Sequence, residues 1–139
     1  MFNKSTICTT ANKLRAQGYT RSQAFIIAWT LAKGQETKVS GTIMNNRQTA
    51  IEHLTRYPAE QVSFTLTREP GNAHDRNAVA VMVSVNGSQP YRIGYIPAAA
   101  ATVVSAILRN GAGVTARLKA IVGGWAEGIS YGLRLCVSL

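Results

Sequence analysis

The residues best suited to recognition chemistry lie in one short stretch, "LTREPGNAHDRNAVAV" at 66–81. Side chains such as Asn72, Asp75 and Asn77 form hydrogen bonds with nearby backbone groups, so they predict a connector held in one shape. Pro70 fixes its own φ angle, and the glycine and asparagine that follow it permit unusual ones. Apolar, β-branched residues come next. The pattern predicts a rigid turn that leads into a buried strand.

Within this stretch, Glu69, His74 and Asp75 are the only plausible acid–base set in the chain. Adjacent residues of one turn rarely converge on a single substrate atom, and no nucleophile accompanies them. The spacing of Cys8, Cys136 and the two histidines does not fit a zinc site. The sequence also lacks the phosphate-binding loop G-x-x-x-x-G-K-[ST]. We therefore expect a protein that is not an enzyme and that has no metal or other cofactor.

The balance of charge favours a polyanionic partner. Fifteen lysines and arginines against six acidic residues give a formal net charge of +9 over 139 residues. Such an excess favours nucleic acid, and the alternative is a basic surface that serves solubility. Hydrophobic residues make up 46% of the chain and charged residues 15%. This composition suits one domain with a packed core and a small appendage.

The apolar and cysteine residues predict a soluble protein of the cytoplasm. The run "AFIIAWTLA" at 24–32 is too short to span a bilayer. Polar residues precede it, which does not fit a signal peptide. Two cysteines far apart in the sequence do not indicate a disulfide framework, so a reducing compartment is expected.

Residues 1–36 are expected to form an N-terminal helical hairpin. Gly18 is suited to end the first helix, and Thr20 begins a capping box with the glutamine three residues later. Trp29 is expected to dock on the main body of the protein. The polar stretch "GQETK" at 34–38 is interpreted as a linker.

Residues 39–139 are expected to form a second unit that is mainly β with helices, so the fold class is α+β. We expect a small OB-like antiparallel barrel of about five strands, with an open α+β sheet as the alternative. The strands are predicted by alternating or continuous apolar residues bounded by turns. Their expected ranges are 39–44, 62–67, 78–85, 91–97, 114–122 and 129–139.

Two helices are expected among these strands. Thr49 and Glu52 have the spacing of a capping box at the start of a helix over 47–58, and a proline would stop that helix. Apolar residues at helical spacing predict the second helix over 98–111, with Gly111 at its end.

Two motifs together resemble the HIRAN domain. The first is "REPGNAHDRNAVAV", and the second is "RIGYIP" followed by an alanine-rich helix. The resemblance covers residues 39–139, with its hallmark in 66–101. It implies a modified OB-like barrel that binds single-stranded DNA, notably at a free 3′ end. Since no ATPase motif accompanies it, the resemblance is to the stand-alone form of bacterial and phage genomes.

The resemblance implies roles for individual residues. Asp75 matches the position whose carboxylate accepts a hydrogen bond from the terminal 3′-hydroxyl. An ionised carboxylate only accepts hydrogen bonds, so it favours a hydroxyl and repels a phosphate. His74 falls where a base is stacked, and Asn72 falls on a polar contact of the same loop. Tyr95 falls where it could contact the nucleic-acid backbone or a base.

Phosphate contacts are expected from basic side chains. The candidates are Arg47, Arg56, Arg68, Arg76, Arg92, Arg117, Lys119 and Arg134. The expected nucleic-acid site combines part of this set with the connector and comprises Arg68, Asn72, His74, Asp75, Arg76, Arg92, Tyr95, Arg117 and Lys119. The remaining basic residues are suited to a solvated rim. Arg68 is equally suited to an internal pair with Glu69 that pins the turn.

One part of the HIRAN pattern is absent. The first strand of the family often carries paired aromatic residues that stack the terminal base, whereas this chain has "GTIMNNRQ", with Met44, Asn45 and Asn46. Each base–aromatic stack contributes about 1–3 kcal/mol. Stacking is therefore expected to be weaker, or to be supplied by Tyr57, Tyr91 or Tyr95.

A second functional hypothesis follows from this difference. The chain could be a protein-interaction factor of a mobile element, such as a counter-defence or anti-CRISPR-like inhibitor that docks on a host nucleoprotein complex. The pattern "AF..AW.LAKG" in the N-terminal hairpin is similar to the leader of many small phage- and plasmid-borne proteins. The expected partner is single-stranded DNA or a DNA 3′ end. The alternative partner is a host protein or nucleoprotein complex, and no membrane is expected.

Overall fold

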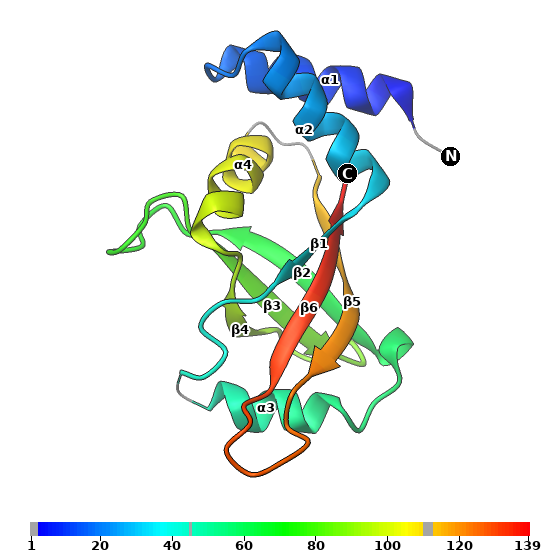
Figure 1. Cartoon of the computed structure of the whole chain (residues 1–139), viewed down its shortest axis with the longest axis vertical. Helices are drawn as coiled ribbons and strands as arrows, with labels where there is room; N and C mark the ends of the chain where they lie inside the picture. Colours follow the sequence, from blue (N-terminus) through cyan, green and yellow to red (C-terminus); the bar gives the residue numbers. More distant parts are fainter. Residues whose placement is uncertain (1–2, 45, 110–112) are drawn as a thin grey trace.

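The N-terminal segment forms a helical hairpin, as the sequence predicts. The computed structural model describes residues 3–44, 46–109 and 113–139. Helices α1 (Lys4–Ala16) and α2 (Arg21–Lys33) pack against each other at one end of the molecule (Figure 1). The hairpin contributes small and branched apolar side chains to the core, namely Ile7, Ala11, Leu14, Ala24, Ala28 and Leu31.

The predicted turn between these helices is confirmed. Gly18 has a φ of +102° just after α1, an angle that glycine adopts without steric cost. The Gln23 N–H donates to Thr20 Oγ1 over 3.2 Å, and the Thr20 N–H donates to Gln23 Oε1 over 3.1 Å. This capping box satisfies two donors that a helix start leaves without intrahelical partners.

The hairpin rests on helix α4 (Ala98–Arg109). Gln17 Nε2 donates to the Ala106 carbonyl over 2.6 Å, which joins the end of α1 to α4. Trp29, which was expected to dock on the main body, is 40% exposed and is not part of the buried core. Lys33 Nζ lies 5.7 Å from the centroid of the Trp29 ring, so the ring makes a cation–π contact within α2.

The rest of the chain builds an antiparallel sheet that curls into a half-barrel (Figure 1). Its six strands in the described residues are β1 (Gln35–Lys38), β2 (Val62–Arg68), β3 (Val79–Val85), β4 (Tyr91–Tyr95), β5 (Thr115–Val122) and β6 (Gly132–Ser138). They are ordered β1-β6-β5-β2-β3-β4 across the sheet. The predicted α+β class with a barrel-like antiparallel sheet is therefore confirmed.

In the described residues, a bridge between Ser40 and Tyr95 joins the two edges of this sheet, and we call it the seam. The Ser40 N–H donates to the Tyr95 carbonyl over 2.7 Å, and the Tyr95 N–H donates to the Ser40 carbonyl over 2.9 Å. Gly94 makes this approach possible, because a Cβ atom there would lie 2.5 Å from Val39 Cγ1 and 2.6 Å from the Ser40 carbonyl oxygen. The glycine of "RIGYIP" thus lets the barrel edges meet.

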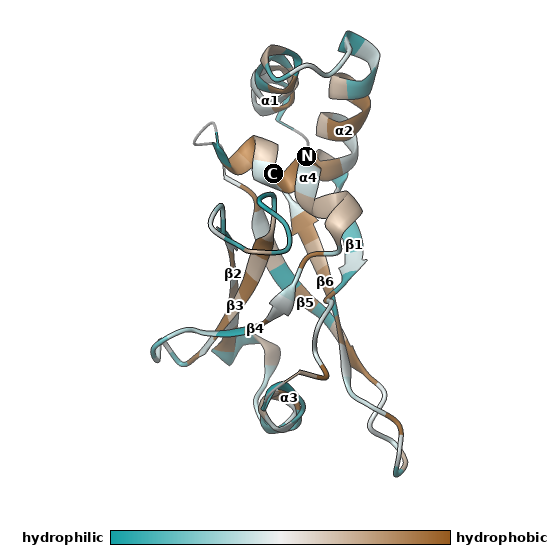
Figure 2. Cartoon of the chain, turned by 90° about the vertical axis from the view of Figure 1, so that its left-hand side faces the viewer, coloured by the Kyte–Doolittle hydropathy of each residue, from teal (hydrophilic) through white to brown (hydrophobic). Residues whose placement is uncertain are grey.

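The inside of the half-barrel is filled by the apolar faces of the strands and α4. The expected alternation of β2 is confirmed, with Val62, Phe64 and Leu66 buried. Strand β3 is apolar on both faces, because α4 packs against it. Figure 2 shows hydrophobic residues concentrated on the strands and on α2 and α4, whereas the connecting loops are largely hydrophilic.

The predicted first strand is displaced along the chain. Residues 34–38 are not a linker, since Gln35–Lys38 form β1 at the edge of the sheet beside β6. Residues 39–44 are not a strand, because after Ser40 the chain turns at Gly41, whose φ is +75°. The first of the six strands in the described residues therefore lies just before the range predicted for it.

Helix α3 (Arg47–Leu54) is shorter than the predicted helix and starts differently. Thr49 and Glu52 do not form the expected capping box, because Asn46 is the N-cap residue and gives no side-chain capping bond. A 3-10 turn at Ala59–Gln61 then leads into β2. The predicted helix over 98–111 is present as α4, and Gly111 lies outside the described residues.

The chain closes with the β5–β6 hairpin, whose two strands were both predicted. Residues 129–131 precede β6 rather than belong to it, and Ile129 is 41% exposed. The turn depends on Gly123, whose φ is +74° and where a Cβ atom would lie 2.0 Å from the Ser130 carbonyl oxygen. Among the described residues, no helix has both the length and the apolar character needed to cross a membrane.

Candidate nucleic-acid interface

The connector between β2 and β3 is held by its own side chains. Asn72 Oδ1 accepts the N–H groups of His74 and Asp75 over 2.9 and 3.1 Å. Asp75 Oδ1 accepts the Asn77 N–H over 2.8 Å. The Glu69 N–H donates to the Ala78 carbonyl over 2.8 Å and closes the base of the loop. These bonds confirm the prediction for the side chains of Asn72 and Asp75, whereas Asn77 takes part through its backbone N–H.

This connector borders an open hollow of about 260 Å³, which we call the elbow pocket. Four of the nine predicted site residues line it, namely Asn72, His74, Asp75 and Tyr95. Ser40 and Ile96 complete its wall on the side of the seam. The structure thus brings Asp75 and His74 of the connector and Tyr95 of β4 to one hollow.

Glu69 connects the connector to β4. Its Oε1 accepts hydrogen bonds from Asn72 Nδ2 over 3.2 Å and from the Tyr95 hydroxyl over 2.9 Å. Its Oε2 pairs with Arg92 Nη1 at 2.6 Å. Arg68 does not form the suggested pair with Glu69, because its Nε donates to Ser105 Oγ on α4 over 3.2 Å. Glu69 therefore fixes the orientation of Tyr95 at the pocket.

The environment of Glu69 favours its charged form. Partial burial alone would raise its pKa. The hydrogen bonds from Tyr95, Arg92 and Asn72 and the positive charge of Arg92 outweigh burial, so the pKa is lowered. Burial, and then the hydrogen bond to Glu69 and its charge, raise the pKa of Tyr95. At neutral pH the pair therefore consists of a carboxylate and a neutral phenol that donates to it.

Two arginines stack near the Tyr95 ring. The Arg92 and Arg47 guanidinium carbons lie 5.6 and 5.7 Å from the ring centroid. Arg47 is 8% exposed, and its Nη1 donates to the Gly41 carbonyl over 2.7 Å. Arg92 has 45% of its side chain exposed. Arg92 is thus the more accessible of the two cations at this ring.

The same arginines line a second hollow of about 350 Å³, together with Asn46, Ala50 and Tyr91. Because both guanidinium groups lie near the Tyr95 ring, this basic hollow adjoins the elbow pocket. Tyr91 contributes an aromatic side chain, and burial raises the pKa of its hydroxyl. Tyr95 links the two hollows, because it lines the elbow pocket and its ring lies near the two arginines of the basic hollow.

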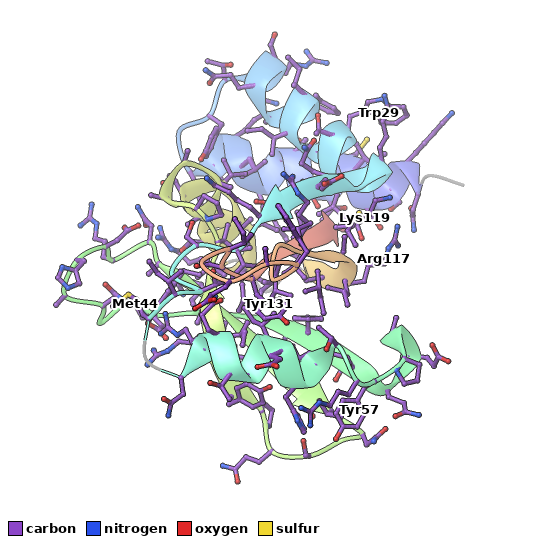
Figure 3. The ribbon with its side chains drawn as sticks, turned by 60° about the horizontal axis from the view of Figure 1, so that its bottom comes forward. Trp29, Met44, Tyr57, Arg117, Lys119 and Tyr131 are labelled. Carbon is purple, nitrogen blue, oxygen red and sulfur yellow. The ribbon has the colours of Figure 1, made fainter. Side chains whose placement is uncertain are left out.

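Other predicted residues lie elsewhere. Arg117 and Lys119 are exposed on β5, which is on the far side of the curled sheet from the seam. Figure 3 shows both pointing away from the part of the molecule that carries Met44. Arg76 is exposed on the connector itself. The structure therefore does not bring Arg117 and Lys119 together with the elbow pocket.

The segment that replaces the aromatic pair of the family pattern forms an exposed turn. Ile43 and Met44 are 69% and 57% exposed, and Asn45 lies outside the described residues. Tyr57 is far from Met44 in Figure 3, and its hydroxyl lies 3.2 Å from His53 Nε2. Of the three tyrosines suggested as stacking residues, Tyr91 and Tyr95 line the two hollows.

From the sequence, Glu69 was expected only as an acid–base candidate or a partner of Arg68, and Arg47 only as a phosphate contact. Glu69 stands next to Arg68 in the sequence, but two of its partners are 23 and 26 residues further along the chain. The sequence signal that could have found its role is the "REP" motif itself.

A family model for the HIRAN domain matches residues 37–127. The chain belongs to the HIRAN family. The matched residues include the connector, the seam and both hollows, whereas α1 and α2 precede them. HIRAN domains are in general DNA-binding modules rather than catalytic domains. No match to the chain was found among curated proteins or solved structures.

The described residues also contain no group of three or more His, Cys, Asp or Glu side chains placed to hold a metal ion.

Proposed function

We propose that this HIRAN domain binds single-stranded DNA and holds a free 3′ end in the elbow pocket. The observation that carries the proposal is the placement of the Asp75 carboxylate, with Asn72, His74 and Tyr95, on an open hollow beside a basic surface. The connector that presents Asp75 is already fixed by hydrogen bonds. Little ordering is therefore needed on binding, which favours affinity.

Asp75 would recognise the terminal hydroxyl. Its Oδ1 accepts the Asn77 N–H, but a carboxylate has two oxygens and about four acceptor sites. It retains the capacity to accept a hydrogen bond from a 3′-hydroxyl. A terminal phosphate would bring negative charge against this carboxylate and would be repelled.

The neighbouring side chains supply the other contacts. His74 is exposed, and an imidazole can stack on a base, although its ring is smaller than that of tyrosine. The exposed Arg76 and Arg92 are suited to phosphates close to the 3′ end. Arg92 also pairs with Glu69, so a phosphate would share the Arg92 guanidinium with the Glu69 carboxylate.

Binding of end-modified oligonucleotides tests the proposal. A fluorescently labelled decathymidylate with a 3′-hydroxyl is expected to bind more tightly than one with a 3′-phosphate, and the affinity of both should fall with salt. Asp75→Asn keeps an oxygen for the Asn77 N–H but removes the charge. It should weaken binding of the hydroxyl end by about tenfold or more, because hydrogen bonds to charged groups are the stronger ones. Arg117→Ser serves as a control distant from the pocket.

Equal affinity for hydroxyl and phosphate ends would contradict the role of Asp75. We also propose that the chain is not an enzyme, since Glu69 and Asp75 are both used to hold the connector. Incubation of labelled single strands with Mg²⁺ or Mn²⁺ should leave them intact, and cleavage that is lost in Asp75→Asn would contradict this.

A further inference from the structure

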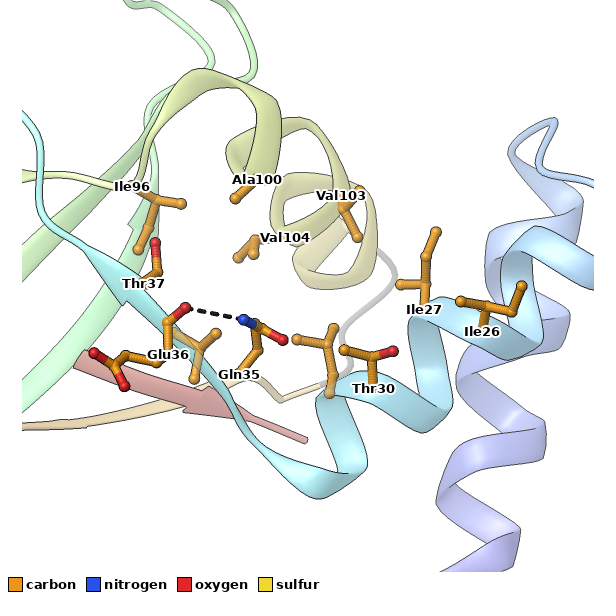
Figure 4. Close-up of a pocket in the computed structure, with 12 residues that line it drawn as sticks. Ile26, Ile27, Thr30, Gln35, Glu36, Thr37, Ile96, Ala100, Val103 and Val104 are labelled. Carbon is orange, nitrogen blue, oxygen red and sulfur yellow. Dashed lines mark hydrogen bonds between the residues drawn. The ribbon is translucent and has the colours of Figure 1, made fainter. Parts of the chain in front are cut away.

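An apolar hollow of about 340 Å³ lies away from the connector and is bounded by α2, β1 and α4 (Figure 4). We call it the edge groove. Its apolar wall comprises Ile26, Ile27, Leu31, Ile96, Val103 and Val104. Helix α2 and the start of β1 precede the residues that the HIRAN model matches. The groove is therefore built jointly by the N-terminal hairpin and the HIRAN domain.

Strand β1 has backbone groups on this side that no neighbouring strand of the described residues pairs with. In an antiparallel pair, alternate residues direct both backbone groups to the partner strand. The Val39 N–H donates to β6 over 3.0 Å, so Thr37 also faces β6. The N–H and C=O groups of Glu36 and Lys38 consequently point the other way, as those of Ser40 do at the seam.

The chain itself explains why this edge stays open. Ser40 pairs with Tyr95, but β4 ends there, Pro97 has no N–H to donate, and α4 begins at Ala98. Pairing with β4 therefore cannot extend along β1. Within the described residues, the exposed carbonyls are contacted by side chains of their own strand. Gln35 Nε2 donates to the Glu36 carbonyl over 3.1 Å (Figure 4).

The charges around the groove indicate the chemistry of an occupant. Glu36 pairs with Arg134 at 3.3 Å, which balances the carboxylate on β1. Lys33 and Lys38 remain as cations just before and at the end of β1. A segment that lies along β1 would thus meet an apolar hollow between two positive charges.

We propose that the edge groove binds an extended peptide segment of a partner protein, which adds as a strand to the free edge of β1. The backbone of the peptide would pair with Glu36 and Lys38, and its alternate apolar side chains would fill the hollow. Acidic residues at its ends would lie near Lys33 and Lys38. Strand addition of this kind gains affinity from backbone hydrogen bonds and specificity from side-chain pockets.

Selection of displayed random decapeptides on the full chain provides the probe. The selected peptides are expected to alternate apolar residues and to carry acidic ends. Their affinity is measured by fluorescence anisotropy with Glu36→Pro and Glu36→Ala. Both variants lose the pair with Arg134, but the proline also removes the N–H that faces the groove. Glu36→Pro should bind about tenfold more weakly than Glu36→Ala, as expected for a lost backbone hydrogen bond.

Two further measurements keep the proposal testable if Glu36→Pro folds poorly. Methylation of the backbone amides of the selected peptide should lower its affinity for the unchanged protein. Ala100→Leu, which fills the groove, should also weaken binding, whereas Thr102→Leu on the exposed face of α4 should not. Retained binding of decathymidylate by these variants shows that the elbow pocket is intact. The proposal is overturned if no peptide is enriched, or if neither amide methylation nor Ala100→Leu changes the affinity.

Discussion

Glu69 links the connector to β4 and to the basic surface. Its carboxylate receives hydrogen bonds from Asn72, Tyr95 and Arg92. A carboxylate beside a DNA-binding surface would ordinarily oppose binding, since it repels phosphate. Here its charge is balanced by Arg92, and its role is to orient the residues that line the elbow pocket.

Substitution of Glu69 tests this role. Glu69→Gln retains an oxygen for the Tyr95 hydroxyl but loses the ion pair with Arg92. We expect the free energy of unfolding to fall by about 1 kcal/mol, because the lost bond involves charged groups at a partly exposed site. Glu60→Gln, which changes an exposed carboxylate on the 3-10 turn, is the matched control. Urea titration of the two variants measures the difference, and an equal effect of both would contradict the role of Glu69.

The lowered pKa of Glu69 gives a pH dependence with a defined sign. In the unfolded chain this carboxyl titrates near its ordinary value of 4.5, and in the folded protein it titrates lower. Its contribution to stability is therefore present above pH 4.5 and is lost as the pH falls through the folded pKa. The unfolding free energy of the native protein should decrease more over this acid range than that of Glu69→Gln. If the unfolding free energies of the native protein and of Glu69→Gln fall in parallel as the pH is lowered, this prediction is contradicted.

Local side-chain chemistry was predictable from the sequence, and long-range pairing was not. The hydrogen bonds that the Asn72 and Asp75 side chains accept join residues two or three positions apart. The Arg92 and Tyr95 partners of Glu69 lie on another strand, and no local pattern specifies them. The charges of Arg117 and Lys119 were visible in the sequence, but their distance from the pocket depends on the order of strands across the sheet.

At the scale of elements, the seam depends on a glycine in β4. Gly94→Ala would place a methyl group against Val39 and the Ser40 carbonyl, so we expect a loss of about 1–3 kcal/mol of stability from overpacking. The shift needed to relieve this contact would also separate Ser40 from Tyr95 and weaken binding of a 3′-hydroxyl end.

Gly71→Ala is the control for this substitution. Gly71 lies in the connector, and a Cβ atom there would have no heavy atom within 4 Å among the described residues. Its unfolding free energy should change by less than about 0.5 kcal/mol. Thermal or urea unfolding of both variants gives the comparison. An unfolding free energy that Gly94→Ala leaves unchanged would contradict the steric role of this glycine at the seam.

Strands with an apolar face were predicted well, and the edge strand was not. Alternation specified β2, β5 and β6 because one face of each is packed on the core. Strand β1 reads "QETK" and is mostly exposed, so its pairing with β6 depends on backbone hydrogen bonds that leave no hydrophobic pattern. The segment after it was wrongly predicted as a strand because Val39, Ile43 and Met44 are apolar, although Gly41 turns the chain.

At the scale of the molecule, the excess of positive charge is not confined to one site. Arg117 and Lys119 on β5 lie opposite the seam in the curled sheet, while Arg47 and Arg92 lie beside it. Charges far from a short bound strand are screened within about 10 Å at 0.1 M salt. The two groups should therefore contribute differently to binding.

Removal of the charges on β5 tests this separation. In the double variant Arg117→Ser/Lys119→Ser, a trinucleotide with a 3′-hydroxyl should bind within about twofold of the native affinity, as expected for surface changes away from a site. The preference for a hydroxyl over a phosphate end should be unchanged. The double variant is compared with Arg92→Ser by anisotropy at several salt concentrations. A larger loss for the β5 variant would place the short strand on the opposite face.

Ile96 belongs to the walls of both the elbow pocket and the edge groove. It follows Tyr95 directly, and its N–H donates to the Val79 carbonyl over 3.0 Å, so its position is tied to the sheet. Its side chain is a wall common to both hollows, so displacing it toward one hollow reduces the room there and enlarges the other. Occupants of the two compartments would consequently alter each other's affinity, and by the same factor in either direction, because thermodynamic coupling between two binding events is reciprocal.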